Sequence, residues 1–107
     1  MGTGNNVLMI NKKDTVAVAL VDLAAGTSLS LSVGDRAVEI TTTQLIQFGH
    51  KVALYRMGPG DAVVKYGEVI GRATREILPG EHVHTHNVDP MRGRGDLAAK
   101  RRGEGDQ

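Results

Sequence analysis

The chain has 107 residues, of which 40% are hydrophobic and 23% charged, and its formal net charge is +1. This length allows one small domain, and the composition is that of a globular protein and not of a disordered or fibrous one. The sequence has no Cys, no Trp, two Tyr and one Phe. It therefore excludes disulfide bonds and cysteine-bound metal clusters, and it offers too few aromatic rings for a nucleic-acid partner bound by base stacking.

Short apolar runs separated by Gly, Pro, Asp and Asn predict an all-β domain. A helical turn is one interpretation of Thr43–Phe48, where apolar side chains follow a Thr cap, although the β-branched neighbours and Gly49 leave an extended conformation equally open. The expected strands, in chain order, are Thr15–Val21, Ser28–Val33, Ala37–Thr41, Val52–Tyr55, Ala62–Lys65, Val69–Ala73 and His82–Asn87.

A weak internal repeat places the turns between these strands. Each copy has a small apolar residue, a larger apolar residue, a Gly and a further apolar residue at the same spacing. Because Gly takes the positive φ that such turns require, each copy predicts a strand, a turn and a return strand, and together an intertwined set of hairpins. The copies are Ala19-Leu23-Gly26-Leu29, Ala53-Met57-Gly60-Val63 and Ala73-Ile77-Gly80-Val83.

The apolar pattern ends near Asp89, which predicts a compact domain over residues 1–89 and a flexible Gly/Arg-rich tail over residues 90–107. The N-terminus has no basic stretch followed by an apolar run, and the longest apolar stretch, Val16–Val21, is too short to cross a bilayer. We therefore expect a cytoplasmic protein that does not associate with membranes.

Three of the four histidines lie at alternate positions, at His82, His84 and His86. In a strand, side chains at alternate positions project from one face, so this pattern predicts a row of imidazoles. Neutral imidazole is a common ligand for zinc, iron and manganese, and we expect at least one of the three to bind a metal or to act in catalysis. A polar edge that faces solvent is the alternative.

Two further segments carry groups suited to chemistry. In Gly49-His50-Lys51, the imidazole can act as an acid, a base or a ligand and the ammonium can hold a carboxylate, with a solvated loop as the alternative. The segment Lys65-Tyr66-Gly67-Glu68 has a cation, a phenol and a carboxylate at a turn, where an ordinary polar turn is the more common case.

Four segments, read in order, resemble the small SAF-like domain of the altronate and galactarate dehydratases over residues 7–88. The resemblance implies a β-clip fold that is either fused to a large catalytic domain or made as a separate small subunit, and a chain that ends soon after Asn87 is similar to the separate subunit. The sulfolactate sulfo-lyases, which eliminate sulfite, share this small-subunit architecture. The segments are Asp14–Leu20, Gly49–Leu54, Val64–Thr74 and Gly80–Val88.

The resemblance also implies elimination of water from a small sugar acid, with a divalent metal, Fe(II) or Mn(II), shared with a large catalytic subunit. We carry over His50 and Lys51 as catalytic residues, and His84 and His86 as metal ligands. The substrate-binding residues are Lys65, Tyr66 and Asn87, with Lys51 and Lys65 as carboxylate clamps. We expect the chain to be inactive alone and to form a complex with the large subunit, or a homo-oligomer. A free-standing SAF-like binding module is the alternative from another functional class.

Overall fold

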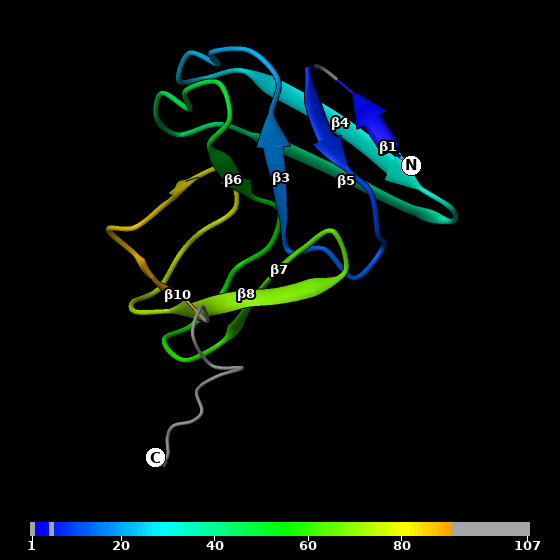
Figure 1. Ribbon diagram of the computed structural model, residues 1–107. Helices are drawn as coiled ribbons and strands as arrows, with labels where there is room; N and C mark the ends of the chain where they lie inside the picture. The colour runs from blue at the N-terminus through cyan, green and yellow to red at the C-terminus, as the bar shows by residue number, and fades with distance from the viewer. Residues whose placement is uncertain (1, 5, 91–107) are drawn as a thin grey trace.

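The computed structural model describes residues 2–4 and 6–90, and these residues form strands and turns without a helix (Figure 1). The predicted all-β fold is therefore confirmed. The predicted tail lies outside the described residues except for Pro90, which ends the last strand. The strands are β1 (Gly2–Gly4), β2 (Val7–Met9), β3 (Val16–Ala19), β4 (Ser28–Val33), β5 (Arg36–Thr41), β6 (Lys51–Ala53), β7 (Ala62–Lys65), β8 (Glu68–Ala73), β9 (His82–Val83) and β10 (Val88–Pro90).

Three antiparallel sheets make up the domain. The largest has the order β1-β2-β3-β6-β9, a second has the order β10-β8-β7, and β4 pairs with β5 in a long hairpin (Figure 1). Apolar side chains fill two clusters, one between β2, β3 and the β4–β5 hairpin, and one between β7, β8, β9 and β10. The sequence pattern did not indicate β1, β2 or β10, which are three residues long and too short to show a period.

A fourth copy of the repeat is present that the sequence pattern did not reveal. It consists of Thr42, Ile46, Gly49 and Val52, and it was hidden because a buried Thr replaces the small apolar residue. Ile46 forms a β-bridge with Leu23, so the helical-turn interpretation of Thr43–Phe48 is wrong and the extended one is right. The N–H groups of Ile46 and Leu23 each donate to the other's carbonyl, at 2.9 and 2.7 Å, which leaves Ile46 no intrahelical partner.

The four copies, numbered in chain order, are paired two by two. The first copy bridges the second through Leu23 and Ile46, and the third bridges the fourth through Met57 and Ile77. The glycine of each copy donates its N–H to the first residue of the partner copy, at 2.8 Å in all four cases, and has a φ between 85 and 91°. The repeat thus specifies two equivalent pairs of interlocked loops, whose donors and acceptors are Gly26 to Thr42, Gly49 to Ala19, Gly60 to Ala73 and Gly80 to Ala53.

A buried carboxylate ties the β7–β8 hairpin to the N-terminal strands. The hairpin turns through Tyr66 and Gly67, both with positive φ, as a two-residue β-turn requires. Asp14, which is fully buried, accepts the N–H of Gly67 at 2.7 Å and the N–H groups of Ile10 and Asn11 at 3.2 Å. The segment Lys65-Tyr66-Gly67-Glu68 therefore has a structural function as a hairpin turn.

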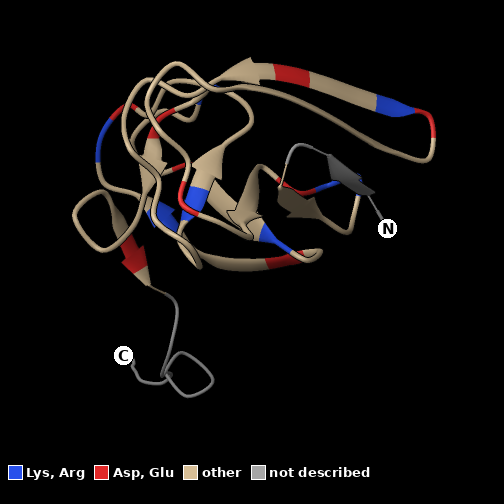
Figure 2. Ribbon diagram, turned by 90° about the horizontal axis from the view of Figure 1, so that it is seen from above, with Lys and Arg blue, Asp and Glu red and all other residues tan. Residues whose placement is uncertain are grey.

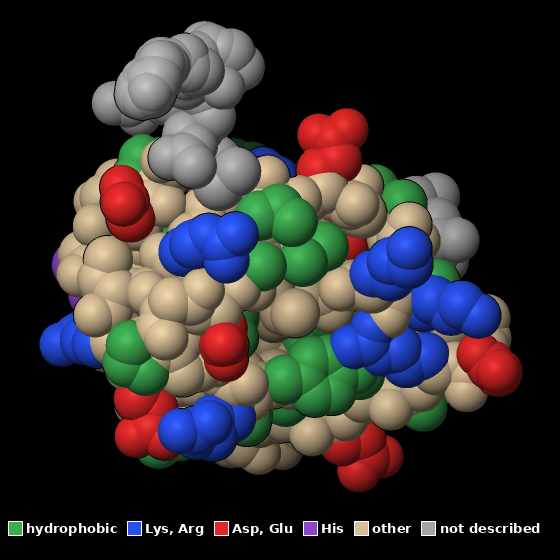
Figure 3. All heavy atoms as spheres, turned by 90° about the horizontal axis from the view of Figure 1, so that it is seen from below, with side chains coloured by type: hydrophobic (Ala, Val, Ile, Leu, Met, Phe, Trp, Pro, Cys, Tyr) green, Lys and Arg blue, Asp and Glu red, His purple; other side chains and the backbone are tan. Residues whose placement is uncertain are grey.

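Charged residues of both signs are distributed over strands and turns (Figure 2). On the face shown in Figure 3, exposed apolar side chains lie between these charges, and histidine side chains reach one edge of the view. None of the described residues belongs to a helix that is long and apolar enough to span a membrane.

Candidate functional site

The pairing of β6 with β9 brings two histidines together that are far apart in the sequence. His82 begins β9, and His50 directly precedes β6, whose Val52 pairs with His82. Nδ1 of His50 lies 2.8 Å from Nε2 of His82. The two rings are stacked, with centroids 5.0 Å apart and an angle of 13° between their planes. This contact depends on the sheet and has no local sequence pattern.

The predicted strand over His82–Asn87 is confirmed only for His82 and Val83, because β9 ends there and residues 84–87 form a bend and a turn. The side chain of Asn87, which is 1% exposed, competes with continued strand pairing. Its Oδ1 accepts the N–H of His84 at 2.9 Å, and its Nδ2 donates to the carbonyl of His82 at 2.9 Å. The backbone N–H of Asn87 donates to the carbonyl of His84 at 3.1 Å. Asn87 therefore holds the turn that positions His84.

The turn brings His84 onto the first two histidines. Its ring centroid lies 4.1 Å from that of His50 and 5.6 Å from that of His82. One nitrogen from each of the three rings lies within 4.8 Å of the other two, and Nδ1 of His84 is buried without a hydrogen-bond partner. We call His50, His82 and His84 the histidine triad. Three convergent imidazoles with an unsatisfied buried nitrogen fit a transition-metal ion as a ligand set.

His86 lies outside the triad. It is exposed, and its tilted ring has its centroid 5.1 Å from that of His82. The predicted ligand pair, His84 and His86, thus has one member in the triad and one beside it. His82 is absent from that pair. The alternating pattern included His82 in the row, but the pattern alone could not show that it faces His50 across β6.

Burial and nearby positive charge lower the pKa of two members of the triad, His82 and His84. Burial and then the positive charges of His50, His86, His84 and Lys51 lower the pKa of His82 to about 4. Burial, followed by the charges of His50, Lys51 and His86, also lowers the pKa of His84. Neutral imidazole is the form that binds a metal, so His82 and His84 are in the metal-binding form at neutral pH.

These shifts predict that the metal-free chain is less stable in acid. The folded chain keeps His82 neutral down to about pH 4, whereas the unfolded chain protonates it near the ordinary value of 6.5. Between these values the unfolded state binds more protons, so the free energy of unfolding falls as the pH is lowered from 6.5 towards 4, and these groups have no effect above that window. Urea unfolding at about pH 7.5 and about pH 5 measures this change. The fall should be smaller in His82→Gln, and an equal fall in both proteins would assign the acid sensitivity to other groups.

A small cavity adjoins the triad on the side of Lys51. It has a volume of about 150 Å³, and Lys51 and His84 are among its lining residues. Burial, and then the charge of Lys65, lowers the pKa of the half-buried Lys51. Lys65 and Tyr66 do not line the cavity. The Lys65 ammonium lies 5.2 Å from the centroid of the Tyr66 ring at the β7–β8 turn.

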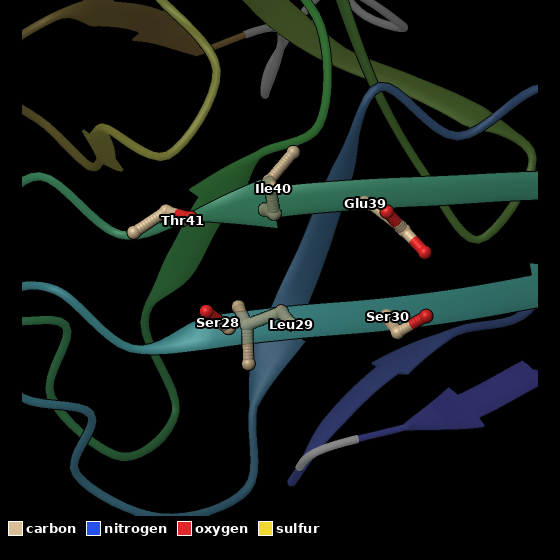
Figure 4. A pocket seen from close by; sticks show the side chains of 6 residues that line it. All are labelled: Ser28, Leu29, Ser30, Glu39, Ile40 and Thr41. Atoms are coloured by element: carbon tan, nitrogen blue, oxygen red, sulfur yellow. The ribbon is translucent and has the colours of Figure 1, made fainter.

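A larger and more open hollow of about 530 Å³ lies over the β4–β5 hairpin (Figure 4). All the residues that line it come from this hairpin, and none is a histidine or a lysine. It is therefore separate from the triad and offers no metal ligand set. The lining residues are Ser28, Leu29, Ser30, Glu39, Ile40 and Thr41.

Comparison with known proteins identifies the family of the chain. The chain is 44% identical to an altronate dehydratase of Escherichia coli and 40% identical to one of Bacillus subtilis, each over 81 residues. Each match covers 76% of this chain but only 16% of the relative, so the chain spans about a sixth of these proteins. It is also 38% identical, over 82 residues, to the (2R)-sulfolactate sulfo-lyase subunit alpha of Chromohalobacter salexigens, a match that covers 74% of this chain and 87% of that subunit. Residues 5–91 match the family described as the altronate/galactarate dehydratase SAF domain, and the chain therefore belongs to this family.

Proposed function

We propose that this chain is the small subunit of a metal-dependent hydro-lyase that dehydrates an altronate-type sugar acid to a 2-keto-3-deoxy acid in the cytoplasm. The similarity to two altronate dehydratases over three quarters of the chain carries this proposal. Because the chain spans 16% of those proteins, a large partner subunit would supply the remaining catalytic groups.

In the proposed reaction, the substrate loses the proton on the carbon beside its carboxylate and the hydroxyl group on the next carbon. Water leaves, and the resulting enol tautomerises to the keto acid. The histidine triad would hold the metal, Fe(II) or Mn(II), shared with the large subunit. A bound metal would polarise the carboxylate and stabilise the departing hydroxide.

The triad changes the roles proposed for two histidines. As a ligand, His50 is not free to act as a general acid or base, so we assign it to the metal with His82 and His84. His86, which is exposed and outside the triad, is not needed as a ligand. Asn87 acts as a positioning residue, because both polar atoms of its side chain are bound within the turn. Lys65 and Tyr66 stay predicted substrate contacts at the β7–β8 turn.

A sulfolactate sulfo-lyase subunit is the second candidate function. The extent of the match supports this candidate. The match covers 87% of the relative from Chromohalobacter salexigens, and that relative is named as one subunit of an enzyme. In this case the leaving group would be sulfite and the substrate a sulfonated acid. The histidine triad would serve either substrate, since both are 2-hydroxy acids.

The test is to purify the tagged chain anaerobically from its native cytoplasm and to assay the complex with altronate and with (2R)-sulfolactate. We expect a larger subunit in stoichiometric amount and a keto acid formed from altronate, with no turnover by the chain alone. Sulfite from sulfolactate would establish the second candidate instead. Turnover by the isolated chain would contradict the small-subunit proposal, and purification without a partner would indicate a free-standing binding module.

A further inference from the structure

The cavity beside the triad is built by three separate parts of the fold. Lys51 comes from β6, and His84 and Thr85 come from the turn that follows β9. Its other lining residues are apolar and come from β8 and β10: Ile70, Val88 and Pro90. The cavity therefore has one polar side, next to the triad, and one apolar side.

The ammonium of Lys51 has no acidic partner among the described residues, whose ion pairs are Lys12 with Asp35 and Arg56 with Glu76. Asp89, between Val88 and Pro90 on β10, is exposed and is not among the residues that line the cavity. A half-buried cation without a carboxylate partner favours an anion as its ligand.

The size and lining of the cavity limit which anion it takes. A volume of about 150 Å³ corresponds to roughly five water molecules. A carboxylate and the carbon or two beside it fit this space. A polyhydroxylated chain gains no contact there, because the side chains of Ile70, Val88 and Pro90 offer its further hydroxyl groups no hydrogen-bond partner.

We propose that this cavity, which we call the Lys51 pocket, binds only the carboxylate end of a 2-hydroxy acid. The Lys51 ammonium binds the carboxylate, the Thr85 hydroxyl supplies a second polar contact, and the rest of the acid stays outside. The inference rests on the proposed function, because it takes the bound carboxylate to be that of the substrate whose elimination occurs at the triad. It follows that the chain does not distinguish acids by their length, and that selection of the sugar chain belongs to the partner subunit.

The experiment is calorimetric titration of the full chain with D-glycerate, a three-carbon 2-hydroxy acid, and with altronate, both in EDTA and after loading with Mn(II). We expect the two acids to bind with dissociation constants within about 3-fold of each other. Lys51→Met should weaken the binding of both acids by about 10-fold or more, because the charge-assisted contact is lost. Lys51→Arg should retain most of the affinity, and Lys13→Met, at an exposed lysine, should have no effect.

Circular dichroism of Lys51→Met, together with its Mn(II) affinity, shows whether the domain and the triad are intact. If altronate binds more than about 10-fold more tightly than glycerate, the chain also contacts the hydroxylated carbons of the sugar acid, and the inference is wrong. No acid binding in either condition, or equal binding by a folded Lys51→Met, would also overturn it. The metal proposal fails separately, if the unmodified chain binds the acids but takes up no Mn(II).

Discussion

Replacing Gly80 by alanine is expected to lower the free energy of unfolding by about 2–5 kcal/mol. Gly80 has a φ of +91°, which costs an L-residue about 1–2 kcal/mol. A Cβ atom there would also lie 2.0 Å from the carbonyl oxygen of Thr41 and 3.0 Å from its carbon. Both contacts are with backbone, and Thr43 donates its N–H to the Gly80 carbonyl at 3.0 Å, so neither segment can move without losing hydrogen bonds.

The matched control is Gly60→Ala, at the equivalent position of the third copy of the repeat. Gly60 has nearly the same φ, +88°, but apart from its chain neighbours no heavy atom lies within 4 Å of the position that a Cβ would take. It should therefore lose only the backbone strain, about 1–2 kcal/mol. Urea unfolding of the two variants measures the difference. Equal losses would mean that the close approach of Thr41 to Gly80 does not exist in solution.

The second large effect is expected in metal binding. Alanine at His50, His82 or His84 should lower the affinity for Mn(II) by at least about 100-fold. Loss of a residue that only hydrogen-bonds to a metal ligand already lowers metal affinity by about 10–100-fold, and loss of a ligand itself should cost more. His86→Ala is the matched control, since its tilted ring contacts His82 from outside the triad, and it should change the affinity by less than about 3-fold.

Equilibrium dialysis with metal analysis measures these affinities, and circular dichroism shows that each variant is folded. If His86→Ala costs as much as His84→Ala while His50→Ala and His82→Ala cost nothing, the metal lies on the pair His84 and His86 that the sequence predicted. If none of the four variants changes the Mn(II) content, the chain holds no metal through its histidines. In that case the large subunit alone would supply the ligands.

The two pairs of interlocked loops also differ in what they expose. At corresponding positions, the third and fourth copies carry Arg56 and Glu76, which form a 2.6 Å ion pair, whereas the first and second carry Asp22 and Leu45. In the second copy, Leu45 is 55% exposed and Phe48 is 66% exposed. The same backbone pattern thus carries charged side chains on one pair of loops and partly apolar side chains on the other. The repeat determines the backbone and leaves the exposed side chains free to vary.

Local sequence patterns were sufficient for the all-β class, for the central strands and for the glycine turns. Gly26, Gly60 and Gly80 were placed correctly because positive φ is a property of the residue itself and its immediate neighbours. The copy at Thr42–Val52 was missed because the repeat was sought in apolar residues, whereas the buried Thr42 satisfies its position with hydrogen bonds.

The candidate site was likewise predictable only where it depends on local sequence. From the sequence alone, the histidine-rich segment, the segment at His50 and the dehydratase-family resemblance could be identified, because each depends on residues close together in the chain. Only the tertiary structure decided which histidines meet, because the pairing of β6 with β9 joins residues 32 apart in the sequence and the Asn87 turn ends the expected strand. Contacts across a sheet depend on register and on buried hydrogen bonds, and neither is encoded in the spacing of the residues that they bring together.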